Sequence, residues 1–224
     1  MGTLSIVATP IGNLEDITLR ALRVLREADV ILCEDTRVTK RLLERHGITN
    51  KQLTTYNEQK SGIKTERIIE WLEEGKDIAL VTDAGTPGVS DPGARLVNTV
   101  RERLPFAKIE AIPGASALTA AISVAGLAAH DFTFLGFLPH KKGKETLFKE
   151  IAAAKRPYIF YESPHRILKT LESLEKFSPE KSVTIARELT KIHEEVARGT
   201  AQELLEYFTN NSDKVRGEFV VLVA

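Results

Sequence analysis

Three turns rich in glycine and proline follow apolar runs in the first half of the chain. They span Ala8–Leu14 (ATPIGNL), Thr82–Gly93 (TDAGTPGVSDPG) and Ile112–Ala117 (IPGASA). Glycine lets the backbone approach a ligand closely and exposes its N–H groups. Loops at the carboxyl ends of parallel strands line the ligand crevice of an open sheet. Any one of these turns could be an ordinary connection, but three together favour a nucleotide-like ligand.

The residues in these loops narrow the class of ligand. The phosphate loop of nucleoside triphosphatases needs GxxxxGK[ST], and no lysine follows a glycine pair here. The dinucleotide fingerprint GxGxxG is missing too, since Gly85-x-x-Gly88 does not complete it. With few cationic residues, the loops disfavour a ligand rich in phosphate. S-adenosylmethionine, which carries a sulfonium and no phosphate, is consistent with them.

Two clusters of polar residues follow apolar runs in the second half. They are Tyr161–Arg166 (YESPHR) and Ala186–Glu195 (ARELTKIHEE). Each combines carboxylates with basic and aromatic or imidazole groups, the types used for general acid–base chemistry. The alternative is a helix cap at Ser163-Pro164 and a solvated run of charges. The tight mixture of both signs after Arg187 favours a functional loop.

Other chemistries find little support in the sequence. The five histidines show no metal-like spacing with one another or with Cys33, so no metal site is expected. The GxSxG elbow of serine hydrolases is absent. A single cysteine cannot form an internal disulfide and fits a reducing cytosol, so we expect a cytoplasmic protein.

The amino-acid composition limits which partners the protein can attract. The 224 residues carry 31 basic and 31 acidic side chains, so there is no global attraction to nucleic acid and a polyanion would need a local basic patch. The longest window of low charge, Ala111–His130, is rich in small and polar residues and predicts a buried helix with its loop. The first residues lack the basic start and long apolar stretch of a signal peptide. We therefore expect no membrane association.

The elements that position these loops alternate between strand and helix. Helical spacing follows Thr18 and Thr36, which could each cap a helix. This alternation predicts an α/β fold with a mostly parallel sheet covered on both faces. Apolar runs predict strands at Leu4–Thr9, Val30–Cys33, Ile78–Thr82, Ile109–Ile112, Phe132–Leu138, Tyr158–Tyr161, Val183–Arg187, Glu194–Arg198 and Phe219–Val223. A change of pattern after Gly126 predicts two domains, residues 1–128 and 129–224.

The ordered set of motifs resembles the tetrapyrrole methylase superfamily over nearly the whole chain, and within it the subfamily that methylates small-subunit ribosomal RNA. The motifs are ATPIGNL with DIT (8–14 and 16–18), CEDTR (33–37), TDAGTPGVSDPG (82–93), IPGASA (112–117), FLP (137–139), YESPHR (161–166) and ARELTK (186–191). The resemblance implies two α/β domains with S-adenosylmethionine in the cleft between them. It also implies an enzyme, a homodimer, that methylates the ribose 2′-hydroxyl of a cytidine, position 1402 of 16S rRNA, within the small ribosomal subunit. Members usually continue past the last strand into a short helical extension linked to RNA contact, and the sequence here stops at Ala224.

The resemblance also implies roles for individual residues. Candidates for the base that deprotonates the ribose are Glu188 and Lys191, then Glu162, with His165 behind them. A lysine in that role would need a depressed pKa, which burial could supply. Cofactor contacts are expected at Pro10, Asp83, Ala84, Gly85, Thr86, Val89, Ser116, Ala117, Tyr161 and Leu189. RNA contacts are expected at Arg37, Lys141, Lys142 and Arg187.

Two other functions are alternatives to methylation of ribosomal RNA. A methyltransferase acting on a corrin or porphyrin precursor would share fold and cofactor. Such enzymes resemble this chain less, since they carry more glycine in the first loop and GDP where this chain has Gly85-Thr86-Pro87. A non-catalytic RNA-binding module is disfavoured by the neutral charge and the three intact loops.

Overall fold

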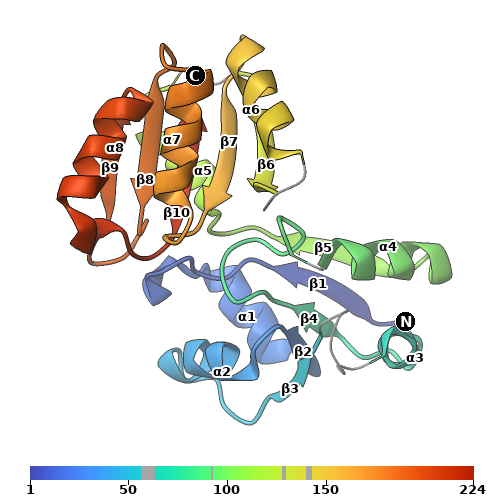
Figure 1. Ribbon diagram of the computed structural model, residues 1–224. Helices are drawn as coiled ribbons and strands as arrows, with labels where there is room; N and C mark the ends of the chain where they lie inside the picture. The colour runs from blue at the N-terminus through green and yellow to red at the C-terminus, as the bar shows by residue number, and fades with distance from the viewer. Residues whose placement is uncertain (57–63, 92, 128–129, 140–142) are drawn as a thin grey trace. The chain divides into compact units, whose positions relative to one another are not determined.

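Two five-stranded sheets form the framework of the chain (Figure 1). The computed structural model describes residues 1–56, 64–91, 93–127, 130–139 and 143–224. Contacts within the chain divide it into two units, Met1–Ser116 and Ala117–Ala224. Each unit holds one sheet with its helices, as predicted for an α/β protein with two domains.

The first unit is built on a parallel sheet with the order β3-β2-β4-β1-β5. Its strands are β1 (Thr3–Val7), β2 (Val30–Cys33), β3 (Gln52–Thr55), β4 (Ile78–Leu80) and β5 (Lys108–Ile112). Its helices are α1 (Leu19–Glu27), α2 (Thr36–Arg45), α3 (Thr65–Glu73) and α4 (Gly93–Arg103), with a 3₁₀ turn η1 at Leu14–Asp16.

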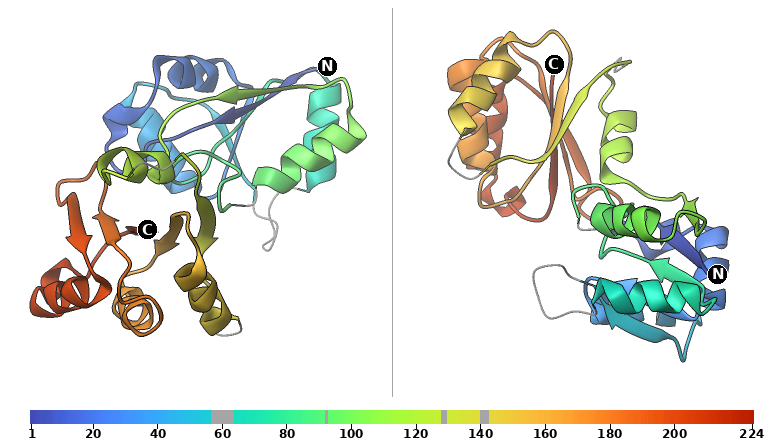
Figure 2. Two further views of the ribbon diagram at one scale, coloured as in Figure 1. Left: turned by 90° about the horizontal axis from the view of Figure 1, so that it is seen from above. Right: turned by 90° about the vertical axis from the view of Figure 1, so that its right-hand side faces the viewer.

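Alternate residues of the central strands in this sheet enter different cores. On β2, Ile31 and Cys33 pack with residues of α1 and α2, whereas Val30 and Leu32 pack with residues of α3 and α4. Successive side chains of a strand point to opposite faces, so the two helix pairs cover the two faces, as Figure 2 shows. The predicted sheet covered on both faces is confirmed.

The helix caps agree with the sequence at one position and differ at another. The Thr18 hydroxyl accepts a hydrogen bond from Ala21 N at 3.1 Å and caps α1 as predicted. At α2 the cap is Asp35 and not Thr36, which is the first helical residue. The extended backbone of Asp35 lets its carboxylate accept from Arg37 N at 2.8 Å, and a carboxylate at this position also interacts favourably with the helix dipole.

Strand β3 was not predicted. Gln52–Thr55 lies at the edge of the sheet and has no fully buried side chain; among the described residues it pairs with β2 alone. The sequence QLTT lacks the run of apolar residues that predicts a strand, and backbone pairing with β2 holds it in the sheet.

The second unit has a mixed sheet with the order β6-β7-β10-β8-β9. Strands β6 and β7 are parallel, and β10 runs antiparallel to both of its neighbours. The strands are β6 (Thr133–Phe137), β7 (Tyr158–Glu162), β8 (Val183–Arg187), β9 (Glu195–Gly199) and β10 (Phe219–Val223), all close to their predicted positions. The helices are α5 (Ala117–Val124), α6 (Lys144–Ala153), α7 (Ile167–Phe177) and α8 (Ala201–Asn210), with a 3₁₀ turn η2 at Ser212–Lys214.

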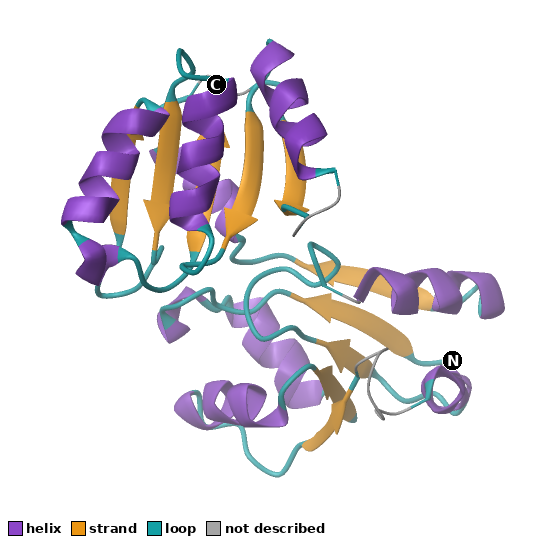
Figure 3. Ribbon diagram, in the orientation of Figure 1, coloured by secondary structure: helices purple, strands orange, loops and turns teal. Residues whose placement is uncertain are grey.

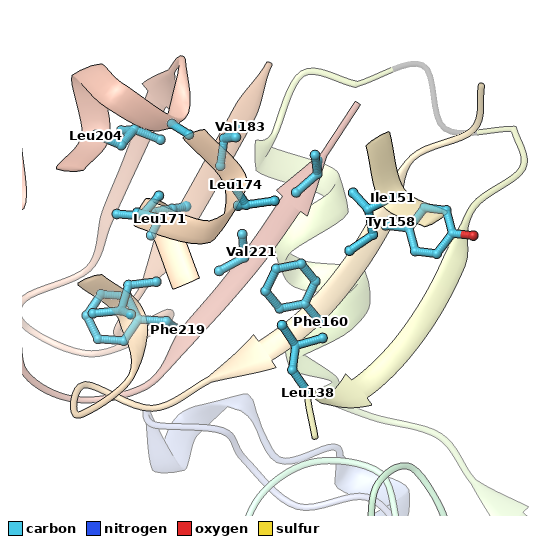
Figure 4. Packing of buried hydrophobic residues seen from close by; sticks show 14 of the residues in the cluster. Leu138, Ile151, Tyr158, Phe160, Leu171, Leu174, Val183, Leu204, Phe219 and Val221 are labelled. Atoms are coloured by element: carbon cyan, nitrogen blue, oxygen red, sulfur yellow. The ribbon is translucent and has the colours of Figure 1, made fainter. Parts of the chain in front are cut away.

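Helices α6, α7 and α8 lie together on one face of this sheet (Figure 3). Phe160 and Val221 point from the sheet into their core, where Leu171 and Leu174 of α7 meet them (Figure 4). Helix α5 lies on the other face, where it contacts β10. The division between the units therefore falls after Ser116 and groups α5 with the second sheet, whereas the sequence placed the boundary at residue 128.

Among the residues that the structure describes, no helix has the length and apolar character needed to cross a membrane.

Candidate functional site

The three glycine loops of the first unit are tied together by hydrogen bonds. Thr9 N donates to Gly85 O at 2.9 Å, and Gly85 N donates to Thr9 O at 3.0 Å. The Thr86 hydroxyl donates to Ala115 O at 3.1 Å and joins the second loop to the third. Because β4, β1 and β5 are neighbours, their loops share the carboxyl edge of the sheet. The predicted cofactor residues of this unit thus lie on connected loops.

Glycines permit this close packing of the loops. Gly85 has a φ of +86°, in the left-handed region that favours glycine, and a Cβ there would lie 3.4 Å from Ile11 Cγ2. At Gly114 a Cβ would lie 3.0 Å from the Ala8 Cβ. Pro10 and Gly85 are buried between the loops, while Asp83, Ala84 and Val89 are exposed at their rim.

Asp91 fixes the shape of the long second loop. Its carboxylate accepts hydrogen bonds from Gly88 N at 2.7 and 2.8 Å, from Val89 N at 3.1 Å and from Gly93 N at 2.7 Å. Several charge-assisted bonds to one carboxylate hold a loop more firmly than bonds to neutral groups do. The backbone of Val89, an expected cofactor contact, is held in place in this way.

Carboxylates gather at the ends of β2 and β4. Asp83 accepts from Asp35 N at 3.1 Å. Partial burial raises the pKa of Asp83, and the charge of Asp35 adds to this. Burial and the charge of Asp83 together raise the pKa of Glu34. This part of the sheet edge is therefore suited to a cation.

Arg37 begins α2 beside these carboxylates. Its side chain is 87% exposed and forms an ion pair with Asp35 at 2.5 Å. Hydrogen bonds from Arg37 lower the pKa of Asp35 to about 2.

The candidate residues of the second unit also lie at one sheet edge. Strands β6, β7 and β8 are mutually parallel, and β10 is antiparallel to them. The carboxyl ends of β7 and β8 and the start of β10 therefore meet. This places Glu162, Glu188 and Glu218 on neighbouring strand ends.

Lys191 bridges two carboxylates at this edge. Its Nζ donates to Glu188 Oε1 at 2.8 Å and to Glu218 Oε2 at 2.9 Å. Glu188 Oε1 also accepts from Glu218 N at 3.1 Å. Glu188 adopts φ +51°, and a Cβ on Gly217 would lie 2.1 Å from Glu188 Oε1. Glycine at position 217 is therefore required for this arrangement.

The charges of this cluster are mutually stabilised. Burial opposes the charge of Lys191, but hydrogen bonds to Glu188 and Glu218 outweigh it and raise the pKa of Lys191. Burial likewise opposes the charge of Glu188, and the bonds from Lys191 and Glu218 N outweigh it and lower the pKa of Glu188. The depressed pKa that a lysine base needs is not what this geometry produces.

Arg187 holds the loop that follows β8 in place. It is buried, and its guanidinium donates to Glu195 Oε2 at 3.4 Å, to His193 O at 3.2 Å and to Arg216 O at 3.4 Å. Glu195 is also held by Lys214 at 2.8 Å. The contacts of Arg187 thus fix the ends of the loop.

Glu162, the third candidate for the base, is enclosed. One of its oxygens accepts from the Thr170 hydroxyl at 2.8 Å. The other accepts from Ser163 N at 2.9 Å and lies 3.2 Å from Arg166 Nε. Its side chain is fully buried. His165, ranked behind it, is exposed.

Tyr161 lies near the first turn of α5. Burial raises the pKa of Tyr161, and a hydrogen bond from the Leu118 backbone opposes the rise. The expected cofactor contacts Tyr161 and Ala117 are therefore close neighbours. Leu189 is buried on the loop after β8. Lys141 and Lys142 fall outside the described residues.

Similar proteins identify the family. A model of Tetrapyrrole (Corrin/Porphyrin) Methylases matches residues 3–205. Ribosomal RNA small subunit methyltransferase I of Thermotoga maritima is 44% identical over 100% of this chain and 99% of its own length. The protein of the same name from Synechocystis is 47% identical over 100% of this chain and 79% of its own. The chain belongs to the ribosomal RNA small subunit methyltransferase I family of the tetrapyrrole methylases.

Solved structures of tetrapyrrole methylases share the fold. The methyltransferase CobJ superposes with a TM-score of 0.70 at 21% identity, covering 100% of this chain and 94% of its own. Uroporphyrin-III C-methyltransferase from Thermus thermophilus, complexed with S-adenosylhomocysteine, gives a TM-score of 0.66 at 18% identity, covering 100% and 97%. The predicted resemblance and the fold class are confirmed.

Two residues of the Lys191 cluster, Glu218 and Gly217, carry no signal in the sequence. Glu218 lies 27 residues after Lys191, and only the pairing of Phe219 with Arg187 brings it to the loop. Gly217 resembles any turn glycine until the Glu188 carboxylate is placed against it. Among the described residues, no group of three or more His, Cys, Asp or Glu side chains is arranged to hold a metal ion.

Proposed function

We propose that this chain transfers a methyl group from S-adenosylmethionine to the ribose 2′-hydroxyl of a cytidine in 16S rRNA. The observation that carries the proposal is the similarity over the full chain, at 44–47% identity, to proteins named ribosomal RNA small subunit methyltransferase I. The target is the cytidine at position 1402, as the resemblance implies. The methyl donor supplies an electrophilic methyl carbon on a positively charged sulfur.

The first unit offers residues that fit such a donor. Its three connected loops contain no lysine or arginine, and carboxylates lie beside them at Glu34 and Asp83. In this proposal Asp83 meets the ammonium or the ribose hydroxyls. Backbone groups around Pro10, the segment from Ala84 to Thr86, and Val89 contact the remainder. Ser116, Ala117, Tyr161 and Leu189 complete the set of expected contacts.

The second unit supplies the groups that act on the ribose. Transfer is an in-line displacement in which the ribose oxygen forms a bond to the methyl carbon, the carbon–sulfur bond breaks, and its electron pair returns to sulfur. The reacting atoms must be held about 3–3.5 Å apart and aligned. A ribose hydroxyl is a weak nucleophile, so a positioned base removes its proton during attack.

Glu188 is the candidate that the contacts favour for this base. Among the described residues, both hydrogen bonds to its side chain fall on Oε1. We assign Oε2 as the acceptor of the ribose proton. Lys191 remains charged between Glu188 and Glu218 and orients the carboxylate. Glu162 is enclosed by its own partners and, in this proposal, supports the strand end.

RNA is held by local positive charge, since the net charge is zero. Arg37, Lys141 and Lys142 are the proposed phosphate contacts. Arg187 is buried and so positions the loop next to the ribose. We further propose that the protein is a cytoplasmic homodimer that acts within the small ribosomal subunit.

The test offers labelled S-adenosylmethionine with three acceptors in parallel: undermethylated 30S subunits, naked 16S rRNA and a tetrapyrrole precursor. Label should enter the ribose 2′-oxygen of one cytidine in the 30S sample. Label in the precursor alone would establish the corrin or porphyrin alternative. Binding of S-adenosylmethionine and RNA without transfer to any acceptor would overturn the proposed catalysis.

A further inference from the structure

Arg166 and the FLP motif, to which the proposed mechanism gives no role, are joined in the structure. Arg166, from the YESPHR motif, donates to Leu138 O at 2.8 Å and to Pro139 O at 3.4 Å, both in the FLP motif. The same guanidinium lies 3.2 Å from the buried carboxylate of Glu162. An ion pair at the end of β7 thus clamps the chain where β6 ends.

This clamp presents one aromatic ring to solvent. Phe137 is 58% exposed, whereas the next residue, Leu138, is buried and points toward Phe160 in the core (Figure 4). The Phe137 ring makes an edge contact with Tyr161, with centroids 5.5 Å apart. Gly136 has φ +62°, and the pairing of β6 with β7 is irregular between Phe134 and Phe137. The backbone therefore departs from regular pairing just where the ring turns outward.

Basic residues lie on the two helices that follow β6 and β7. Lys144 begins α6, and its Nζ lies 5.5 Å from the Phe148 ring centroid. Burial lowers the pKa of Lys144, and the nearby charges of Arg166 and Lys169 contribute to the shift. Lys169 is exposed on α7, one turn beyond Arg166. Lys144, Arg166 and Lys169 thus lie near one another, together with the carboxylates of Glu162 and Glu172. Of the three cations, Arg166 contacts the FLP motif directly.

An exposed aromatic ring beside basic side chains matches what unpaired RNA requires. Sequence-specific RNA recognition targets bases that are splayed out and stacked on aromatic side chains. Cationic groups beside the ring hold the phosphates.

We propose that Phe137 is an RNA-binding residue that stacks on an unpaired base at or next to the methylated nucleotide. The inference rests on the proposed function, because it assigns the RNA contact of the same site. Arg166 acts through Phe137 as a positioning residue, and Lys169 supplies charge to a neighbouring phosphate.

The experiment compares Phe137→Ala with Phe137→Trp and with Phe106→Ala. Phe106 is the matched control, since it is 94% exposed and lies in the first unit. For each variant we would measure KM for undermethylated 30S subunits, the affinity for S-adenosylmethionine by calorimetry, and the thermal unfolding midpoint. Loss of one stacked base should raise KM roughly 5- to 100-fold in Phe137→Ala. Phe137→Trp should restore it, and Phe106→Ala should leave it unchanged.

Salt dependence separates stacking from charge. Phe137→Ala should leave the slope of log KM against log salt unchanged, whereas Lys169→Ala should reduce it by about one phosphate contact. An unchanged KM in a folded Phe137→Ala protein would overturn the inference. Equal loss of S-adenosylmethionine affinity would also overturn it, because the ring would then pack against the methyl donor. If the wild type fails to methylate 30S subunits, the proposed function fails and not the role of Phe137 alone.

Discussion

At the scale of single residues, the proposed chemistry depends on the Glu188 and Lys191 side chains. We expect Glu188→Gln to slow methyl transfer about 10²- to 10⁴-fold, the usual contribution of a general base. Lys191→Met should slow transfer as well, because it removes the group that orients the Glu188 carboxylate. Affinity for S-adenosylmethionine should stay within a few-fold, because the donor loops are unaltered. Single-turnover rates on 30S subunits check this. Ile192→Ala is the control, since Ile192 is 94% exposed on the same loop. Normal rates of methyl transfer in both variants would show that the general base is another residue.

The same pair predicts how stability depends on pH. The pKa of Glu188 is lowered in the folded state, so its contribution is present above its unfolded value near 4.5 and is lost as pH falls through the folded value. The pKa of Lys191 is raised, so its contribution is present below about 10.5 and is lost as pH rises further. The stability difference between wild type and Lys191→Met should be flat from pH 6 to pH 9 and shrink below pH 4. Chemical unfolding across this range measures the difference, and a difference that stays unchanged below pH 4 would contradict the prediction.

Glu162 predicts an effect on folding. Its buried carboxylate accepts from Thr170 and Ser163 and pairs with Arg166. Glu162→Gln should destabilise the protein by about 1–3 kcal/mol, because a buried polar group loses a charged partner. The denaturant midpoint should fall, and Glu172→Gln, at an exposed position of α7, should not shift it. An unchanged midpoint together with a large loss of rate would instead indicate a catalytic Glu162.

At the scale of elements, the apolar strands were predictable and the polar contacts between them were not. A strand such as Val183–Arg187 can be predicted from the sequence, because its buried positions require apolar residues. Strand β3 pairs with β2 and packs only Leu53 against the core, so its four residues give no apolar pattern. The partnership of Glu218 with Lys191 follows from the register of β10 against β8, which no local pattern encodes.

The connected loops of the first unit carry their own prediction. Gly85→Val should abolish binding of S-adenosylmethionine, since φ is +86° and the new side chain would meet Ile11. Gly75→Val is the control: its φ is +91°, but nothing lies within 4 Å of its Cβ position. Both variants carry the backbone strain, about 1–3 kcal/mol, and only the first alters the loops. Calorimetry measures binding, and circular dichroism verifies the fold. Equal affinity for S-adenosylmethionine in the two variants would contradict the assignment of these loops as the binding site.

At the scale of the whole molecule, we expect a homodimer. The expectation comes from the resemblance to the family. Light scattering at micromolar concentration should give about twice the mass of the 24.8 kDa chain. The measurement should be repeated at high salt, because an assembly held by apolar surface persists where one held by surface ion pairs weakens. A mass of one chain under both conditions would contradict the dimer.

The position of β10 has a consequence for synthesis. This strand is the last of the ten in sequence, yet it occupies the centre of its sheet between β7 and β8. A growing chain completes β7 about 60 residues before β10, a delay of roughly 3–12 s at ordinary translation rates. During that interval β7, and β8 once it is made, lack the strand that pairs with both, and an unpaired edge is the kind of surface that templates misassembly. The first unit, whose strands are all made by Ile112, can mature earlier. A chaperone that captures nascent chains should therefore hold the second half of this protein longer than the first.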